Sequence, residues 1–130
     1  MHERKEHRYL LQTPMPAQLK RGWFRRTSVI LVDISIDGLA IACEKALPKN
    51  TQLEFHLKLG TQKLTITGEV IYQMGFGDRA RYGVQLQPAL SLETLNLFSP
   101  YFNEEDRIIL QNERLLSLGD QLNCDDGCNT

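Results

Sequence analysis

The stretch LTITGEVIY, residues 64–72, shows the pattern that decides the fold. Its apolar side chains recur with a period of two, with polar ones between them, so one face of an extended chain points inward and the other outward. The alternating apolar residues are Leu64, Ile66, Val70 and Tyr72. Gly68 interrupts the run and predicts a bulge or a bend. The stretch therefore predicts a strand that packs one face against a core.

The same short period continues on both sides, from Ala17 to Leu86, where β-branched and aromatic residues are frequent. Turn residues separate the runs, since Gly and Asn supply positive φ and Pro presets a turn. These turn signals lie at residues 37–38, 47–50, 60–61 and 75–78. Six strands are predicted, over residues 17–20, 27–34, 38–43, 52–59, 63–75 and 80–87. Short antiparallel strands in this number favour a closed barrel over residues 17–87.

After Pro88 the pattern changes to that of helices. Ser91 is a suitable N-cap for a first helix, which Pro100 ends. Asn103, followed by acidic residues that suit the helix macrodipole, starts a second helix. Helices are therefore predicted within residues 91–118.

The second helix carries an apolar stripe, which can dock on the barrel or pair with a second copy of the chain. Its residues are Ile108, Ile109, Leu115, Leu116 and Leu118. We expect docking, in a monomer. Residues 119–130 are polar and without periodicity, so nothing offsets the entropy of ordering them. They are predicted to form a disordered tail.

The N-terminal residues 1–12 are polar and basic, and Pro14 and Pro16 follow them. Each proline fixes its own φ and favours extended geometry in the residue before it, which separates this segment from the strand pattern. A flexible arm is therefore predicted over residues 1–12. The expected fold class is mainly β: a six-stranded antiparallel β-barrel with C-terminal α-helices, in one domain over residues 1–118.

Composition limits the function. The chain has 130 residues and a formal net charge of -1, so it has no general attraction to nucleic acid or to an anionic membrane. The N-terminus is charged, and no apolar run approaches the ~20 residues that a bilayer span requires. We expect a cytoplasmic protein with no membrane insertion. The scattered cysteines, Cys43, Cys124 and Cys128, favour neither disulfides nor a metal site.

Two short motifs stand out. Residues 4–8, RKEHR, read RxxxR, and residues 33–38, DISIDG, read DxSxxG. At average residue usage, the two in this order are expected by chance on the order of once in a thousand sequences. Their order and separation resemble the signature of the PilZ domain. The resemblance extends over residues 3–118 and includes Tyr82-Gly83-Val84 in the last strand.

The resemblance implies a cytosolic bacterial receptor for cyclic di-GMP, with no cofactor and no metal. A guanidinium on a flexible arm gains little until a ligand fixes it, so we expect the arm to close over the nucleotide and to relay binding to an unidentified protein. The family suggests control of motility, biofilm or exopolysaccharide. The RxxxR arginines and the DxSxxG turn would form the ligand site. The predicted binding residues are Arg4, Lys5, Arg8, Asp33, Ser35, Gly38 and Tyr72.

These residue types suit the ligand, a dianion that carries two guanines. Arginine forks bind phosphate oxygens and the guanine O6/N7 edge through paired charge-assisted hydrogen bonds, and Lys5 adds a positive charge. Asp33 can accept from the guanine N1 and N2 donors, and Ser35 can meet polar edges or phosphate. Gly38 permits close approach of the backbone. Tyr72 either stacks on a guanine or packs in the core.

Other interpretations stay open. Alone, RxxxR is most often a solvated N-terminus, and residues 33–35 can simply cap a hairpin. The barrel could be an adaptor without ligand, or, with Trp23 and Phe24 beside arginines, an OB-like nucleic-acid binder. The intact motifs disfavour the first and the net charge disfavours the second. An enzyme is not expected, because no nucleophile with a base, carboxylate pair or metal cluster can be assembled. The histidines that lack such company are His2, His7 and His56.

Overall fold

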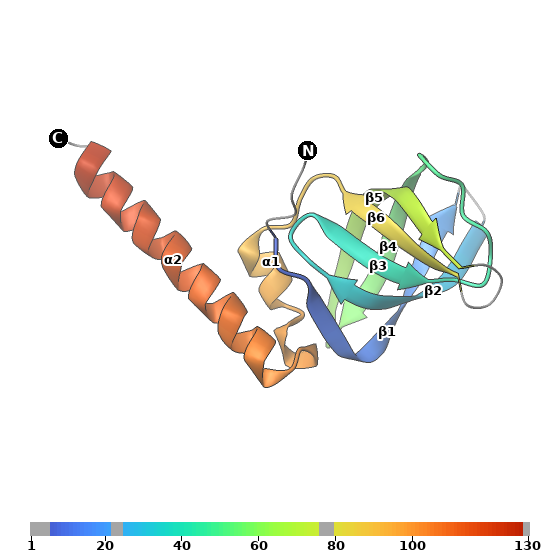
Figure 1. Ribbon diagram of the computed structural model, residues 1–130, viewed down its shortest axis with the longest axis horizontal. Coiled ribbons are helices and arrows are strands. Elements are labelled where there is room, and N and C mark those ends of the chain that lie inside the picture. Colours follow the sequence, from blue (N-terminus) through green and yellow to red (C-terminus); the bar gives the residue numbers. More distant parts are fainter. Residues whose placement is uncertain (1–5, 22–24, 76–79, 129–130) are drawn as a thin grey trace.

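The computed structural model describes residues 6–21, 25–75 and 80–128. Six antiparallel strands close into a barrel in the order β1-β2-β3-β6-β5-β4, and helices follow the last strand (Figure 1). The strands are β1 (Tyr9–Arg21), β2 (Arg25–Ile34), β3 (Gly38–Ala42), β4 (Gln52–Leu59), β5 (Gln62–Met74) and β6 (Arg81–Leu86). The predicted fold class, a six-stranded antiparallel barrel with C-terminal helices, is confirmed.

Strand β1 begins at Tyr9, eight residues before the predicted start at Ala17. It includes residues 9–12, which the sequence analysis assigned to the flexible arm, and that boundary is wrong. The prolines are tolerated because β1 has β2 alone as a neighbour there: its pairing with β4 covers only residues 18–20. A proline lacks a donor, so it fits a strand where one side has no partner. Burial of Tyr9 and Leu11 holds this early segment in place.

The turn signals are confirmed at most positions. Among the described residues, positive φ occurs at Asn50, Gly60 and Gly75. Gly38 is not one of them, so the expected positive φ at that turn is wrong: it is already the first residue of β3, opposite Gln85. Extended ladder geometry removes the need for the left-handed region there.

Gly68 marks no bulge, which corrects a second expectation. The ladder shift in β5 falls between Val70 and Tyr72 instead. A Cβ on Gly68 would lie 2.6 Å from the backbone oxygen of Gln85, so the glycine allows β5 and β6 to approach closely.

The barrel interior is filled by large apolar side chains that are fully buried. They include Leu19, Leu31, Ile34, Leu39, Ile41, Phe55 and Tyr82. A second group, from the segment after the barrel, continues this core: Leu95, Phe98, Phe102 and Leu110. The two groups belong to one hydrophobic cluster, so the helical segment is part of the same folded unit.

Helix α1 (Leu92–Asn96) is capped by Ser91, whose Oγ accepts from the Thr94 N–H at 3.0 Å. A short 3-10 turn, η2 (Ser99–Tyr101), follows. Helix α2 (Glu104–Cys128) starts where Asn103 Oδ1 accepts from the Asp106 N–H at 2.7 Å. Both predicted helix starts are therefore confirmed, and each is fixed by a side-chain cap.

Helix α2 points away from the barrel after its first turns (Figure 1). Leu110 is buried, but most of the apolar stripe lies exposed: Ile108, Leu115, Leu116 and Leu118. The expectation that this stripe docks on the barrel is wrong, because the contacts that the structure describes for α2 lie in its N-terminal half, with η2, α1 and His7. Residues 119–128, expected to have no fixed structure, continue the helix, which contains Gly119 and Gly127 but no proline in this part. No described helix has the length and apolar content needed to cross a membrane.

Candidate functional site

The turn between β2 and β3 is held by its own hydrogen bonds. Ser35 is completely buried: its N–H donates to Gly38 O at 2.8 Å and its Oγ donates to Asp37 Oδ1 at 3.0 Å. Two further bonds fix the turn from outside, from Leu86 N–H to Asp37 O (2.9 Å) and from Leu90 N–H to Ile36 O (2.7 Å). The DxSxxG motif is thus a rigid turn clamped between the end of β6 and the segment before α1.

The two sequence motifs meet at Arg8 and Asp33. Arg8 Nη1 donates to Asp33 Oδ1 at 2.6 Å, across 25 residues of sequence. Both side chains keep part of their surface open, 32% for Arg8 and 20% for Asp33. A charge-assisted bond between partly exposed groups is easily exchanged for another partner. Arg4 and Lys5, predicted to act with Arg8, lie outside the described residues, as do Trp23 and Phe24.

A row of residues that begins at Asp33 crosses the outer face of the barrel. Successive ladder partners are Asp33 on β2, Ala40 on β3, Gly83 on β6 and Tyr72 on β5. Their neighbours Ile34, Leu39, Ile41, Tyr82 and Val84 point inward and are buried. With strands about 4.8 Å apart, the row spans roughly 14 Å of backbone from the carboxylate to the aromatic ring. The two residues in its middle, Ala40 and Gly83, are small.

Tyr72 lies at the far end of this row and is 41% exposed, so it is not a core residue. Its ring lies directly over Gly83: a Cβ on that glycine would sit 2.2 Å from Tyr72 Cε2. Of the two alternatives that the sequence left open, packing in the core is therefore excluded. Sequence reasoning missed Ala40 and gave Gly83 no role in binding. A glycine within a strand was the available signal, since it marks close approach of another group.

The beginning of β1 is anchored to the start of α2. His7 Nε2 lies 2.9 Å from Asp106 Oδ1, and the His7 ring packs edge-on against Tyr9, with centroids 4.6 Å apart. Tyr9 in turn stacks on Phe102 at 4.9 Å. Burial, followed by the nearby carboxylates of Glu113, Asp106 and Glu6, raises the pKa of Tyr9 to about 12. Sequence reasoning gave His7 no role, and no local pattern could have found a partner 99 residues away.

The described site residues thus fall into two groups. Arg8 and Asp33 are in contact, and Tyr72 shares a row with Asp33. Ser35 and Gly38 form the turn beside them, with the Ser35 hydroxyl turned into the protein. Within the ranges that the structure describes, no three His, Cys, Asp or Glu side chains are grouped as a metal site would need.

Comparisons with known proteins agree with this fold. The PilZ domain family model matches residues 2–102. Among solved structures, the PilZ domain with c-di-GMP of YcgR from Escherichia coli has a TM-score of 0.56 at 16% identity, covering 92% of this chain and 98% of that one. A search of the curated proteins finds no match.

Two larger proteins share the fold at the same TM-score of 0.56. The Borreliella burgdorferi PlzA protein in complex with c-di-GMP is 17% identical, with 78% of this chain and 41% of that chain covered. The Bacillus subtilis inhibitor of motility MotI/DgrA is 11% identical, with 75% and 49% covered. The chain thus spans less than half the length of these two proteins. The family match covers most of the sequence, including both motifs and every strand of the barrel, and the chain belongs to the PilZ domain family.

Proposed function

We propose that the chain is a receptor for cyclic di-GMP in the bacterial cytoplasm, which binds the nucleotide on the outer face of β2, β3, β6 and β5 and passes the signal to a partner protein. The contact of Arg8 with Asp33 carries the proposal, because it unites the two motifs at one end of a row that ends in an aromatic ring. The PlzA and YcgR structures with c-di-GMP share this fold. The proposed role is binding and signalling, not catalysis.

The row fits the shape of a guanine. Because the Tyr72 ring covers Gly83, the small side chain of Ala40 leaves a low floor between the Asp33 carboxylate and the ring. A base stacked on the outer face of the Tyr72 ring extends over this floor and presents its N1 and N2 donors to Asp33. Stacking on an aromatic side chain contributes about 1–3 kcal/mol per base. Polar recognition at one end and stacking at the other would orient the base.

Arg8 and Asp33 neutralise each other in the structure, so binding is an exchange of partners. The ligand supplies an acceptor for Arg8, either a phosphate oxygen or the guanine O6/N7 edge, and a donor for Asp33. The charge of each side chain is then satisfied by the nucleotide and not by the other side chain. Arg4 and Lys5, earlier in the same segment, would add positive charge against the phosphates.

The arm offers a route for the signal. His7, which contacts Asp106 at the start of α2, directly precedes Arg8. A backbone movement that carries Arg8 onto the nucleotide therefore acts on the contact between the arm and α2. Ser35 and Gly38 would contribute by keeping the turn in place, since the Ser35 hydroxyl is bonded within it. Binding would thus change the arm against a fixed barrel.

Calorimetric titration with cyclic di-GMP, with GTP as the control ligand, tests the proposal and gives the stoichiometry. Arg8→Ala removes a charged hydrogen-bonding partner and should weaken binding by about 1.5–3 kcal/mol, or roughly 10- to 100-fold. Arg26→Ala is the matched control: Arg26 is an exposed arginine near the other end of β2, and its loss should leave affinity unchanged. A folded wild-type chain that gives no heat with cyclic di-GMP would reject the receptor and leave a PilZ-fold adaptor that acts through protein contacts alone.

A further inference from the structure

A second recessed surface lies on the barrel, between β1 and β4. The two strands are paired only where Gln18, Leu19 and Lys20 face His56, Phe55 and Glu54. Strand β4, in contrast, stays paired with β5 along its whole length, from Gln52 to Leu59. Beyond His56 the side of β4 that faces β1 has no ladder partner among the described residues. Pro16, two residues before Gln18, has no N–H with which to extend the ladder.

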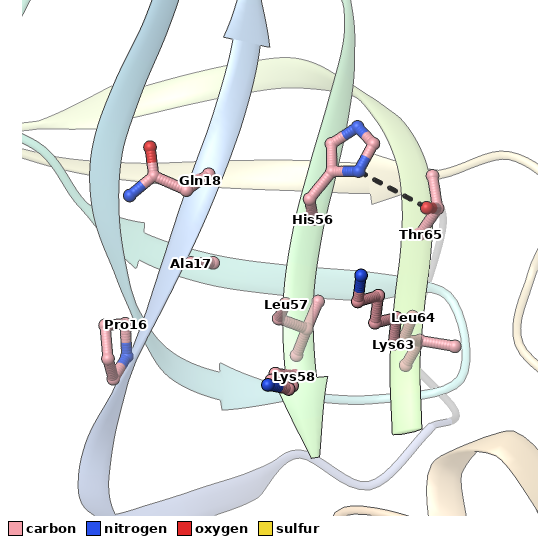
Figure 2. A pocket seen from close by; sticks show the side chains of 9 residues that line it. All are labelled: Pro16, Ala17, Gln18, His56, Leu57, Lys58, Lys63, Leu64 and Thr65. Atoms are coloured by element: carbon pink, nitrogen blue, oxygen red, sulfur yellow. Dashed lines mark hydrogen bonds between the residues drawn. The ribbon is translucent and has the colours of Figure 1, made fainter. Parts of the chain in front are cut away.

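The separation of the strands opens a cavity of about 400 Å³. Figure 2 shows its lining from β1, β4 and the start of β5: Pro16, Ala17, Gln18, His56, Leu57, Lys58, Lys63, Leu64 and Thr65. Ala17, Leu57 and Leu64 belong to the inward-facing set of their strands and form an apolar floor. Cavities of roughly 300–1,000 Å³ with a mainly apolar lining and few polar groups are typical of binding sites.

The rim of the cavity is basic. Lys58 and Lys63 are direct ladder partners on the exposed face of β4 and β5, and none of the nine lining residues is acidic. Like charges directly opposite each other on a sheet are unfavourable. In the described part of the chain neither lysine is paired with a carboxylate; the nearby Glu54 lies against His56 instead, with 2.6 Å between Oε2 and Nε2. Within the described ranges, the lysine pair therefore lacks a counter-charge.

We propose that this groove docks an extended, acidic segment of a partner protein. The unpaired edge of β4 at Leu57–Leu59 offers backbone groups to an added strand. Alternate side chains of such a strand point to opposite faces, so an apolar residue enters the floor at Leu57 and Leu64 while neighbouring carboxylates reach Lys58 and Lys63. On β5 the groove is lined by residues 63–65, at least seven residues before Tyr72, and it shares no residue with the row from Asp33 to Tyr72, so nucleotide and partner can bind together.

Selection from a displayed random dodecapeptide library, without nucleotide, tests the groove independently of cyclic di-GMP binding. Peptides with carboxylates alternating with apolar residues should be enriched. Their affinity should fall about 10-fold or more with Lys58→Glu/Lys63→Glu, since two charge-assisted contacts become repulsive. The matched control, Lys45→Glu/Lys49→Glu, makes the same change of net charge in the exposed loop before β4 and should retain binding.

Three results would overturn the proposal. The first is a selection with no excess of acidic residues. The second is an equal loss of affinity in the two charge-reversed variants, which would show only a long-range effect of net charge. The third is displacement of the selected peptides by octanoate at equal concentration, which would show a site for small amphipathic carboxylates and not for an extended chain.

Discussion

The two motifs of the nucleotide site differ in how they are held. The turn Ser35–Gly38 is fixed by backbone and side-chain bonds, and its serine is completely buried. The arm is held at His7 and Arg8 by one ionic contact each, to Asp106 and Asp33, and the His7 and Arg8 side chains stay 38% and 32% exposed. Exposed ion pairs contribute about 0–1 kcal/mol, whereas a buried group that loses its partner costs about 1–3 kcal/mol. The turn is therefore part of the fold, and the arm is the part that a ligand can move.

The largest effect on stability should come from Ser35→Ala. The change leaves Asp37 Oδ1 without the Ser35 donor, so the free energy of unfolding should fall by about 1–3 kcal/mol. Urea denaturation measures it. Ser28→Ala, at an exposed serine of β2, is the control and should stay within about 0.5 kcal/mol of wild type. The comparison fails if Arg8→Ala destabilises the chain as much as Ser35→Ala does.

Tyr9 fixes the end of the arm and should make stability depend on alkaline pH. Its pKa is raised from 10.0 to about 12, chiefly by burial, so the folded chain keeps the phenol neutral after the unfolded chain has ionised it. The stabilisation is complete below pH 10 and is lost as the pH rises toward 12, by on the order of 2 kcal/mol. Urea denaturation of wild type and Tyr9→Phe over this range isolates the effect. Parallel pH profiles for the two proteins would contradict it.

Two glycine substitutions test whether the Tyr72 ring takes part in binding. The methyl group of Gly83→Ala forces the Tyr72 ring away from β6. Because that ring is partly exposed, it can move with little loss of stability. Affinity for cyclic di-GMP should nevertheless fall roughly 10-fold. Gly68→Ala meets the backbone of Gln85 and should instead destabilise the barrel. Calorimetry and thermal melting distinguish the two. Unchanged affinity in Gly83→Ala would remove Tyr72 from the site.

The smallest effect is expected from the contact between the arm and α2. His7→Ala removes an interaction of the empty chain that is worth at most about 1 kcal/mol, so affinity for cyclic di-GMP should rise by up to about fivefold. Asp106→Asn removes the same contact from the other side and should behave alike. Weaker binding in both variants would mean that the contact persists in the bound state.

Local patterns predicted the parts of the fold whose causes are local. The alternation in β5 and the caps at Ser91 and Asn103 could be predicted from the sequence, because the strand period and the helix ends depend on nearby residues. The start of β1 could not be predicted in this way. Whether a strand tolerates Pro14 and Pro16 depends on how far β4 pairs alongside β1. The same holds for α2, whose exposed stripe depends on where the helix leaves the barrel.

The candidate site was predictable to a similar degree. The motifs named Arg8 and Asp33, and the structure brings them together. The positions of Ala40 and Gly83 in the site could not be predicted, because they are set by the ladder register of four strands. The register is a property of the closed barrel and cannot be obtained from any one strand.

The most direct test of the proposed nucleotide site is a nitrogen–proton NMR titration of the chain with cyclic di-GMP, in which the shift of each backbone amide is followed. We predict that the largest shifts fall on the amides of Asp33, Ala40, Gly83 and Tyr72. The amides of His7 and Arg8 should also shift, while those of Lys58 and Lys63 should not. Shifts centred on the groove of β1 and β4, or spread evenly over the barrel, would contradict it.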